Sequence, residues 1–350
     1  MSKNLLSKYS TRQSNIELLR IISMFAILFW HGIHHGFLQC DIIDGFGINI
    51  LNLCHWACFW HVNVFLLISG YFGIKFRWKN VLNFLLYILF YYVLLLILIP
   101  IISNGNISLY SIIRAPYTFF HDFIGWWFVK PYMFLMLLSP ILELARKVSN
   151  EKLISILVSL TILNIIVGFL FQGGFNNDGF CVEQFCYMYV IGIFIQRFKD
   201  KIQNKLSISK CLSLFMILTL VLFLVGKFSN WSSWYGYNNP LVIINSCLIL
   251  LLFLRVKLQN NLCNTIAIST LAVYLLTDHN ILTRPFIIKL TKCISELSNG
   301  NVFYILVSWF VICIIIFALC ILFDMLLRVI MKYILRFLSK FTLNPSDCGI

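Results

Sequence analysis

Residues 302–327 read VFYILVSWFVICIIIFALCILFDMLL, with Asp324 as the single charged residue. An apolar run of this length is enough to span the hydrocarbon core of a bilayer as a helix, which takes about 20 residues. Residues 81–102 form a second run of the same character. Neither run alternates with a period of two, and both are too long for the strands of a membrane barrel. The sequence therefore predicts an all-α, polytopic integral membrane protein.

The composition of the whole chain agrees with this prediction. Of 350 residues, 60% are hydrophobic and 11% are charged, and the mean hydropathy is +0.89. Because lipid offers no hydrogen bonds to the backbone, the apolar segments should be helical. We expect about ten transmembrane helices, at roughly residues 16–37, 55–74, 81–102, 122–142, 153–171, 181–198, 211–226, 240–254, 265–283 and 302–327. They would form one membrane domain over residues 1–350.

The positive charge points to membrane topology. The net charge is +14, but the basic residues lie in short gaps between apolar runs and form no basic face of a soluble domain, so no nucleic-acid partner is expected. Most of the 27 lysines and arginines fall in alternate loops. The positive-inside rule then places both termini in the cytoplasm, with residues 1–15 as an uncleaved N-terminal segment and residues 328–350 as a basic tail.

The cysteines and histidines predict no metal site. Most of the 12 cysteines lie inside apolar runs, where a thiol packs as a small hydrophobic group, and no disulfide framework follows. Cys54 and Cys58 lack partners at zinc spacing. His31 and His35 are one helical turn apart, but no acidic or cysteine ligand adjoins them in the sequence, so a metal pair is not expected there either.

The first apolar segment, NIELLRIISMFAILFWHGIHHG at residues 15–36, carries ionisable residues where they are costly. At ~100° per residue, Arg20 and His31 lie only about 20° apart around the helix and about 16 Å apart along it. Such a pair suits a long anionic substrate, with Arg20 on a phosphate and His31 as a general base. The structural alternatives are a snorkelling arginine and a hydrogen-bonded core histidine.

Other ionisable or aromatic residues near the predicted helix ends are weaker candidates. Trp126 and Trp127 fit an interfacial aromatic belt. Lys130 would lie about two turns inside its span, where it needs a carboxylate, carbonyl groups or an anionic substrate. Asp278 and His279 would lie near the outer end of the ninth span. A structural ion pair explains these charges about as well as catalysis does.

Four segments together resemble one family. Arg20 and His31 enclose ten residues on the first span, and residues 62–72 read VNVFLLISGYF, in which packing best explains Ser69 and Gly70. Residues 126–142 read WWFVKPYMFLMLLSPIL, and residues 269–280 read STLAVYLLTDHN. These motifs are similar to those of the membrane acyltransferase-3 family, whose members typically O-acetylate bacterial surface polysaccharides. In the last motif Thr277 occupies the usual histidine position and His279 lies two residues on.

The resemblance implies a membrane O-acyltransferase of the bacterial cytoplasmic membrane. Acetyl-CoA would be the donor, no cofactor would be permanently bound, and a hydroxyl of a surface polysaccharide or its lipid-linked precursor would be the acceptor. His31 and Arg20 would be the catalytic residues, and Arg20 would also bind the CoA together with the basic residues Lys75, Arg77 and Lys79. We expect the acceptor near Trp126, Trp127, Lys130, Asp278 and His279. The alternative is a non-enzymatic flippase or exporter of lipid-linked glycans.

Overall fold

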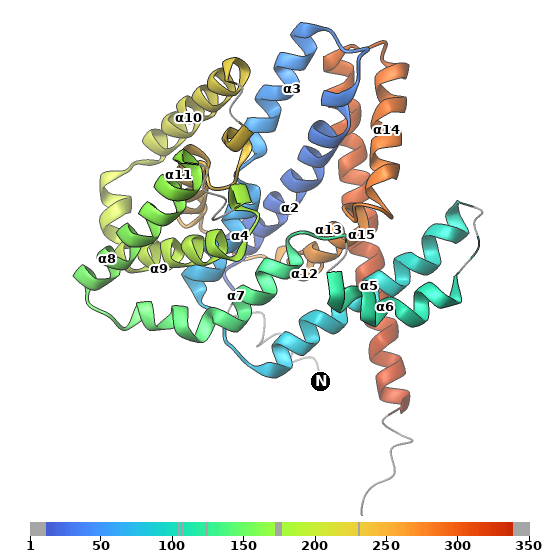
Figure 1. Ribbon diagram of the computed structural model, residues 1–350, viewed down its shortest axis with the longest axis horizontal. Coiled ribbons are helices and arrows are strands. Elements are labelled where there is room, and N and C mark those ends of the chain that lie inside the picture. The colour runs from blue at the N-terminus through green and yellow to red at the C-terminus, as the bar shows by residue number, and fades with distance from the viewer. Residues whose placement is uncertain are drawn as a thin grey trace, which may run out of the picture.

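The structure is a computed structural model in which every regular element of the described residues is a helix, as predicted (Figure 1). The described residues are 12–103, 106, 108–122, 125–171, 177–229 and 232–338. The α-helices are α2 Ser14–His35, α3 Gly45–Cys58, α4 His61–Phe72, α5 Trp78–Ile102, α6 Leu109–Asp122, α7 Val129–Leu142, α8 Asn150–Thr161, α9 Val182–Lys205, α10 Ile208–Phe228, α11 Pro240–Phe253, α12 Asn261–Ile268, α13 Thr270–Thr277, α14 Arg284–Leu297 and α15 Val302–Leu338. The shorter elements are the 3-10 turns η1 Phe37–Gln39, η2 Glu143–Arg146, η4 Asn177–Gly179 and η5 Ser232–Tyr235, and the π-helical segment η3 Ile162–Leu170.

Within the described residues, six helical segments are long and apolar enough to cross a membrane. They are Ser14–Gln39, Gly45–Phe72, Trp78–Ile102, Asn150–Leu170, Ile208–Phe228 and Val302–Ile330. By length and composition this is a membrane protein. The other four predicted spans coincide with helices that are shorter or more polar, namely α7, α9, α11 and the pair α12–α13. Ten crossings and cytoplasmic termini stay predictions; most of both predicted terminal segments lies outside the described residues.

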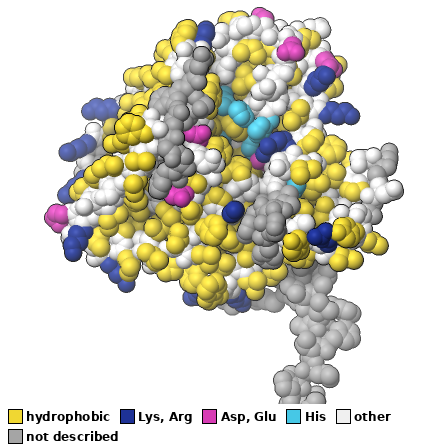
Figure 2. All heavy atoms as spheres, viewed as in Figure 1, with side chains coloured by type: hydrophobic (Ala, Val, Ile, Leu, Met, Phe, Trp, Pro, Cys, Tyr) yellow, Lys and Arg dark blue, Asp and Glu magenta, His cyan; other side chains and the backbone are white. Residues whose placement is uncertain are grey.

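Large apolar side chains cover the outside of the molecule. Ile113, Phe228 and Val307 are 78%, 79% and 67% exposed, and hydrophobic side chains dominate the face drawn in Figure 2. Contiguous apolar surface of this kind is costly in water and neutral in lipid. The exposed faces therefore fit a protein whose solvent is the bilayer.

Helix α2 lies at the centre of the helices that form the site. It packs against α3, α4, α12, α13 and α15, and Figure 1 shows it running beside α3 and α15. Gly32 permits the close approach of α15, because a Cβ there would lie 2.1 Å from Trp309 Cζ2. The Trp309 indole in turn donates to the Phe29 carbonyl at 2.9 Å. These contacts hold the half of α2 that carries His31 against α15, and His31 is buried there.

Two glycines bring α4 and α9 into backbone contact. A Cβ at Gly70 would lie 2.0 Å from the Tyr189 carbonyl oxygen, and a Cβ at Gly192 would lie 2.4 Å from the Leu67 carbonyl oxygen. Small residues at a helix crossing permit this approach. The geometry therefore gives Gly70 the packing role that was expected for it.

Two predicted helix starts, those of the second and fourth spans, were wrong. The second span begins at Gly45, where Asp44 accepts from the Gly47 amide at 2.6 Å as the N-cap, and is interrupted at residues 59–60. Helix α7 begins at Val129 after a turn at Gly125, whose φ is +95°. Lys130 is therefore in the first turn and exposed, not two turns inside a span.

The predicted ninth span is also divided. Helices α12 and α13 break at Ser269, and α13 ends at Thr277, so Asp278 and His279 lie in the connection to α14. The His279 ring caps this turn, because Nδ1 accepts from the amides of Ile281 and Leu282 at 3.3 and 3.1 Å. A side chain that satisfies backbone amides in this way competes with continuation of the helix.

Candidate functional site

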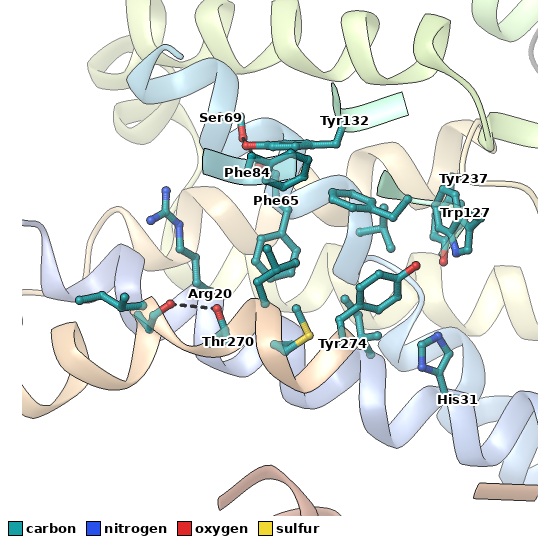
Figure 3. A pocket seen from close by; sticks show the side chains of 17 residues that line it. Arg20, His31, Phe65, Ser69, Phe84, Trp127, Tyr132, Tyr237, Thr270 and Tyr274 are labelled. Atoms are coloured by element: carbon teal, nitrogen blue, oxygen red, sulfur yellow. Dashed lines mark hydrogen bonds between the residues drawn. The ribbon is translucent and has the colours of Figure 1, made fainter. Parts of the chain in front are cut away.

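Arg20 and His31 line one internal cavity of about 310 Å³. The other lining residues come from α2, α4, α5, α7 and the residues just before it, the segment before α11, and α12–α13: Met24, Ile27, Val62, Phe65, Ser69, Phe84, Trp127, Phe128, Tyr132, Tyr237, Ala267, Ile268, Thr270, Leu271 and Tyr274. Figure 3 shows Arg20 and His31 toward opposite ends of this group, with aromatic side chains between them. The shared passage expected from helical periodicity is thus present.

The cavity wall is mainly aromatic. Trp127 stacks on Tyr237 with ring centroids 5.4 Å apart, and Phe128 stacks on Tyr132 at 5.3 Å. Tyr237 is held in place through its carbonyl, which accepts from Asn63 Nδ2 and Gln184 Nε2, each at 2.9 Å. A largely apolar cavity with a few polar groups is the usual form of a small-molecule site. No local sequence pattern marked Tyr237, because it enters from a connecting segment.

His31 is paired with an acidic residue from another part of the chain. His31 Nε2 lies 3.4 Å from Asp278 Oδ2, and both side chains are buried. The other Asp278 oxygen, Oδ1, accepts from Arg284 Nε at 2.9 Å and lies 2.9 Å from Arg284 Nη2. His31 Nδ1 has no hydrogen-bond partner among the described residues. Arg284 can hold Asp278 as a carboxylate, and Asp278 can orient the imidazole.

Arg284 was not among the site residues predicted from the sequence. Its position six residues after Asp278 carries no helical or strand periodicity. Only the turn between α13 and α14, together with Pro285 in the first turn of α14, brings the two side chains together. The sequence contains the two charges but no pattern that pairs them.

At the other end of the cavity, Arg20 has a carboxylate neighbour. Its Nη1 lies 3.2 Å from Glu17 Oε1 and 3.3 Å from Oε2, and its side chain is 35% exposed. The ion pair balances the charge of Glu17, and the remaining guanidinium donors are available to an anionic ligand. Arg20 is therefore neither isolated in lipid nor fully neutralised.

The predicted CoA-binding lysines and arginine do not line the cavity. Lys75, Arg77 and Lys79 are exposed around the connection between α4 and α5. Ser69 does line it, and its hydroxyl donates to the Phe65 carbonyl at 2.8 Å and lies 3.3 Å from Tyr132 Oη. The cavity and the basic residues are therefore separate features of the structure.

His279 lies outside the cavity lining although it is next to Asp278. Its ring stacks on Tyr92 at 5.8 Å and meets Trp126 edge-on at 4.8 Å. Trp126 is only 1% exposed, so the interfacial-belt interpretation is wrong for it. Its neighbour Trp127 lines the cavity instead.

A second cavity, also about 310 Å³, shares Trp127 with the first. Lys130 and Glu183 line it together with aromatic side chains that include Trp126 and Phe180. Aromatic faces beside charged groups suit a ligand with both apolar faces and hydroxyl groups. The structure therefore places Trp126, Trp127 and Lys130 around one cavity, apart from Asp278.

Comparison with known proteins gives a single result. Neither a curated protein nor a solved structure matches the chain. The model of the acyltransferase domain that defines the acyltransferase-3 family matches residues 13–325. This match covers nearly all of the described helices, and it includes the whole cavity as well as Asp278 and Arg284. The chain belongs to the acyltransferase-3 family of membrane acyltransferases.

Proposed function

We propose that this protein transfers an acetyl group from acetyl-CoA to a hydroxyl of a cell-surface polysaccharide or its lipid-linked precursor, in a bacterial cytoplasmic membrane. The observation that carries the proposal is the single cavity that Arg20 and His31 share. A cation at one end and an imidazole about 16 Å along the same helix suit an extended donor that is anionic at one end and reactive at the other.

In this proposal His31 is the general base. We assign the proton of the neutral ring to Nε2, the nitrogen that faces Asp278, so that the lone pair of Nδ1, which has no partner among the described residues, is left to accept. His31 takes the proton of the acceptor hydroxyl while the hydroxyl oxygen attacks the thioester carbonyl. The carbon–sulfur bond then breaks, and the imidazolium returns the proton to the CoA thiolate. The products are the O-acetyl ester and free CoA.

The remaining site residues bind or orient the substrates. Arg20 binds a phosphate of the donor by charge-assisted hydrogen bonds. Lys75, Arg77 and Lys79 attract the anionic donor from a distance, because they are exposed and lie outside the lining. The acceptor sugar occupies the second cavity beside Lys130 and reaches His31 past Trp127, which lines both cavities.

The test uses membranes that contain the full chain, labelled acetyl-CoA and the glycan fraction of the host. Wild-type membranes should add acetyl groups to the glycan, and His31→Ala should lower the rate by about 10²-fold or more, as loss of a general base does. His34→Ala is the matched control, because its ring stacks on Trp30 at 4.4 Å outside the cavity lining. Full activity in His31→Ala, or no transfer by wild-type membranes, would overturn the proposal.

A further inference from the structure

Three potential metal ligands meet beside the end of the cavity at which His31 lies. One ligand atom each from His31, His35 and Asp278 lies within 4.8 Å of the other two. His31 and His35 are one turn apart on α2, and their ring centroids are 5.5 Å apart. Asp278 arrives from the connection after α13. The acidic ligand that the sequence did not show beside the two histidines is therefore supplied by the fold.

The distance between His31 and Asp278 fits two ligands of one metal ion. Their 3.4 Å separation is long for an N–H···O hydrogen bond, whose usual range is about 2.7–3.2 Å. Two ligands bound at about 2.1 Å in tetrahedral geometry lie about 3.4 Å apart. Asp278 Oδ2 and His31 Nδ1 have no hydrogen-bond partners among the described residues. Buried polar atoms without partners call for an explanation, and a ligand supplies one for the carboxylate oxygen.

The surroundings of the three residues also suit a metal. Arg284 occupies Asp278 Oδ1, which fixes the carboxylate and leaves Oδ2 directed at His31. Hydrogen bonds of this kind orient the ligands of metal sites. His35 is only partly buried, so the three ligands are not sealed from outside. Two imidazoles and one carboxylate form a set that Zn²⁺ binds with a fourth position open for water or an anion.

We propose that His31, His35 and Asp278 bind one divalent cation of the Zn²⁺ class, and that the bound ion inhibits acyl transfer. The inhibitory part rests on the proposed function. A metal on His31 Nε2 takes that lone pair and displaces the proton to Nδ1, because a ligating imidazole is neutral with its other nitrogen protonated. His31 then has no lone pair with which to accept the proton of the acceptor hydroxyl. Asp278 is then a ligand of the same ion and no longer orients the imidazole as a hydrogen-bond acceptor.

Metal binding is tested directly on the purified full chain in detergent. After removal of metals by a chelator, Co²⁺ and Zn²⁺ are titrated, with Co²⁺ followed by its visible absorption and Zn²⁺ by calorimetry. Wild type should bind one ion per chain. His35→Ala should lower the affinity more than about tenfold, since even loss of an outer hydrogen-bond partner of a ligand costs 10–100-fold. His34→Ala, which removes a neighbouring histidine outside the ligand set, should bind as wild type does.

Equal affinity in His35→Ala and wild type, or no stoichiometric binding by wild type, would overturn the site. These titrations measure metal affinity without any acyl transfer, so they test the metal site even if the proposed function is wrong. Inhibition is measured separately by adding Zn²⁺ to the membrane assay. Zn²⁺ should inhibit wild type and His34→Ala, whereas His35→Ala should keep its basal rate and resist the metal. Metal binding without inhibition of wild type would overturn the inhibitory role alone.

Discussion

The imidazole of His31 lies beside the carboxylate of Asp278, with 3.4 Å between Nε2 and Oδ2, although one residue lies on α2 and the other follows α13. Arg284 holds the opposite oxygen of the same carboxylate. The three side chains form a chain of contacts that runs from the partly exposed Arg284 through the buried Asp278 to His31 at the cavity. This arrangement makes Asp278 a positioning residue whose importance can be measured.

Asp278→Asn should lower kcat by roughly 10²- to 10⁴-fold and leave the KM for acyl-CoA nearly unchanged, because an amide no longer orients the imidazole or stabilises its protonated form. Steady-state kinetics in membranes give both constants. Asp324→Asn is the control: Asp324 is equally buried but accepts from Tyr87, Tyr91 and Arg328, away from the cavity lining. If kcat were unchanged in Asp278→Asn, Asp278 would have no role in the mechanism.

Arg20→Ala should raise the KM for acyl-CoA about tenfold or more while changing kcat less, since the side chain binds the donor far from the reacting carbonyl. Arg20→Lys keeps the charge but loses the bidentate geometry, so it should recover part of the affinity. The triple variant Lys75→Ala, Arg77→Ala, Lys79→Ala should have a smaller effect that disappears at high salt, because these residues are exposed. If the KM for acyl-CoA rose in the triple variant and not in Arg20→Ala, the donor would be bound by Lys75, Arg77 and Lys79 and not by Arg20.

The two adjacent tryptophans should separate activity from stability. Trp127→Ala opens the wall between the two cavities and should weaken binding of the acceptor, measured as a higher KM for the glycan. Trp126→Ala removes a buried ring that packs on His279 and also lines the second cavity, so besides weakening acceptor binding it should destabilise the fold by about 3–5 kcal/mol. Thermal unfolding in detergent measures the second effect. Equal effects of the two variants on both readouts would contradict these assignments.

Gly70→Ala should destabilise the protein by about 1–3 kcal/mol or prevent its accumulation, because the added Cβ meets the Tyr189 carbonyl oxygen at the α4–α9 crossing. Gly45→Ala is the matched control, because nothing lies within 4 Å of a Cβ at that position. The melting temperature and the yield in membranes report the difference. An unchanged melting temperature in Gly70→Ala would show that the two helices can separate without cost.

The sequence by itself determined the helical membrane fold and the common face of Arg20 and His31. Both follow from local rules: a long apolar run in lipid must satisfy its own backbone, and helical periodicity sets which side chains align. The small residue Gly70 at a helix crossing could also be anticipated from its motif. In each case the deciding residues are close together in the chain.

Only the tertiary structure decided which groups surround His31. The turn after Thr277 takes Asp278 to His31 and turns His279 away toward Tyr92 and Trp126, although the two residues are adjacent. The turn at Gly125 leaves Lys130 exposed. Tyr237 reaches the site from a connecting segment, and Arg284 reaches it from the first position of α14. Contacts between distant segments depend on where helices end and how they pack, and no local pattern contains that information.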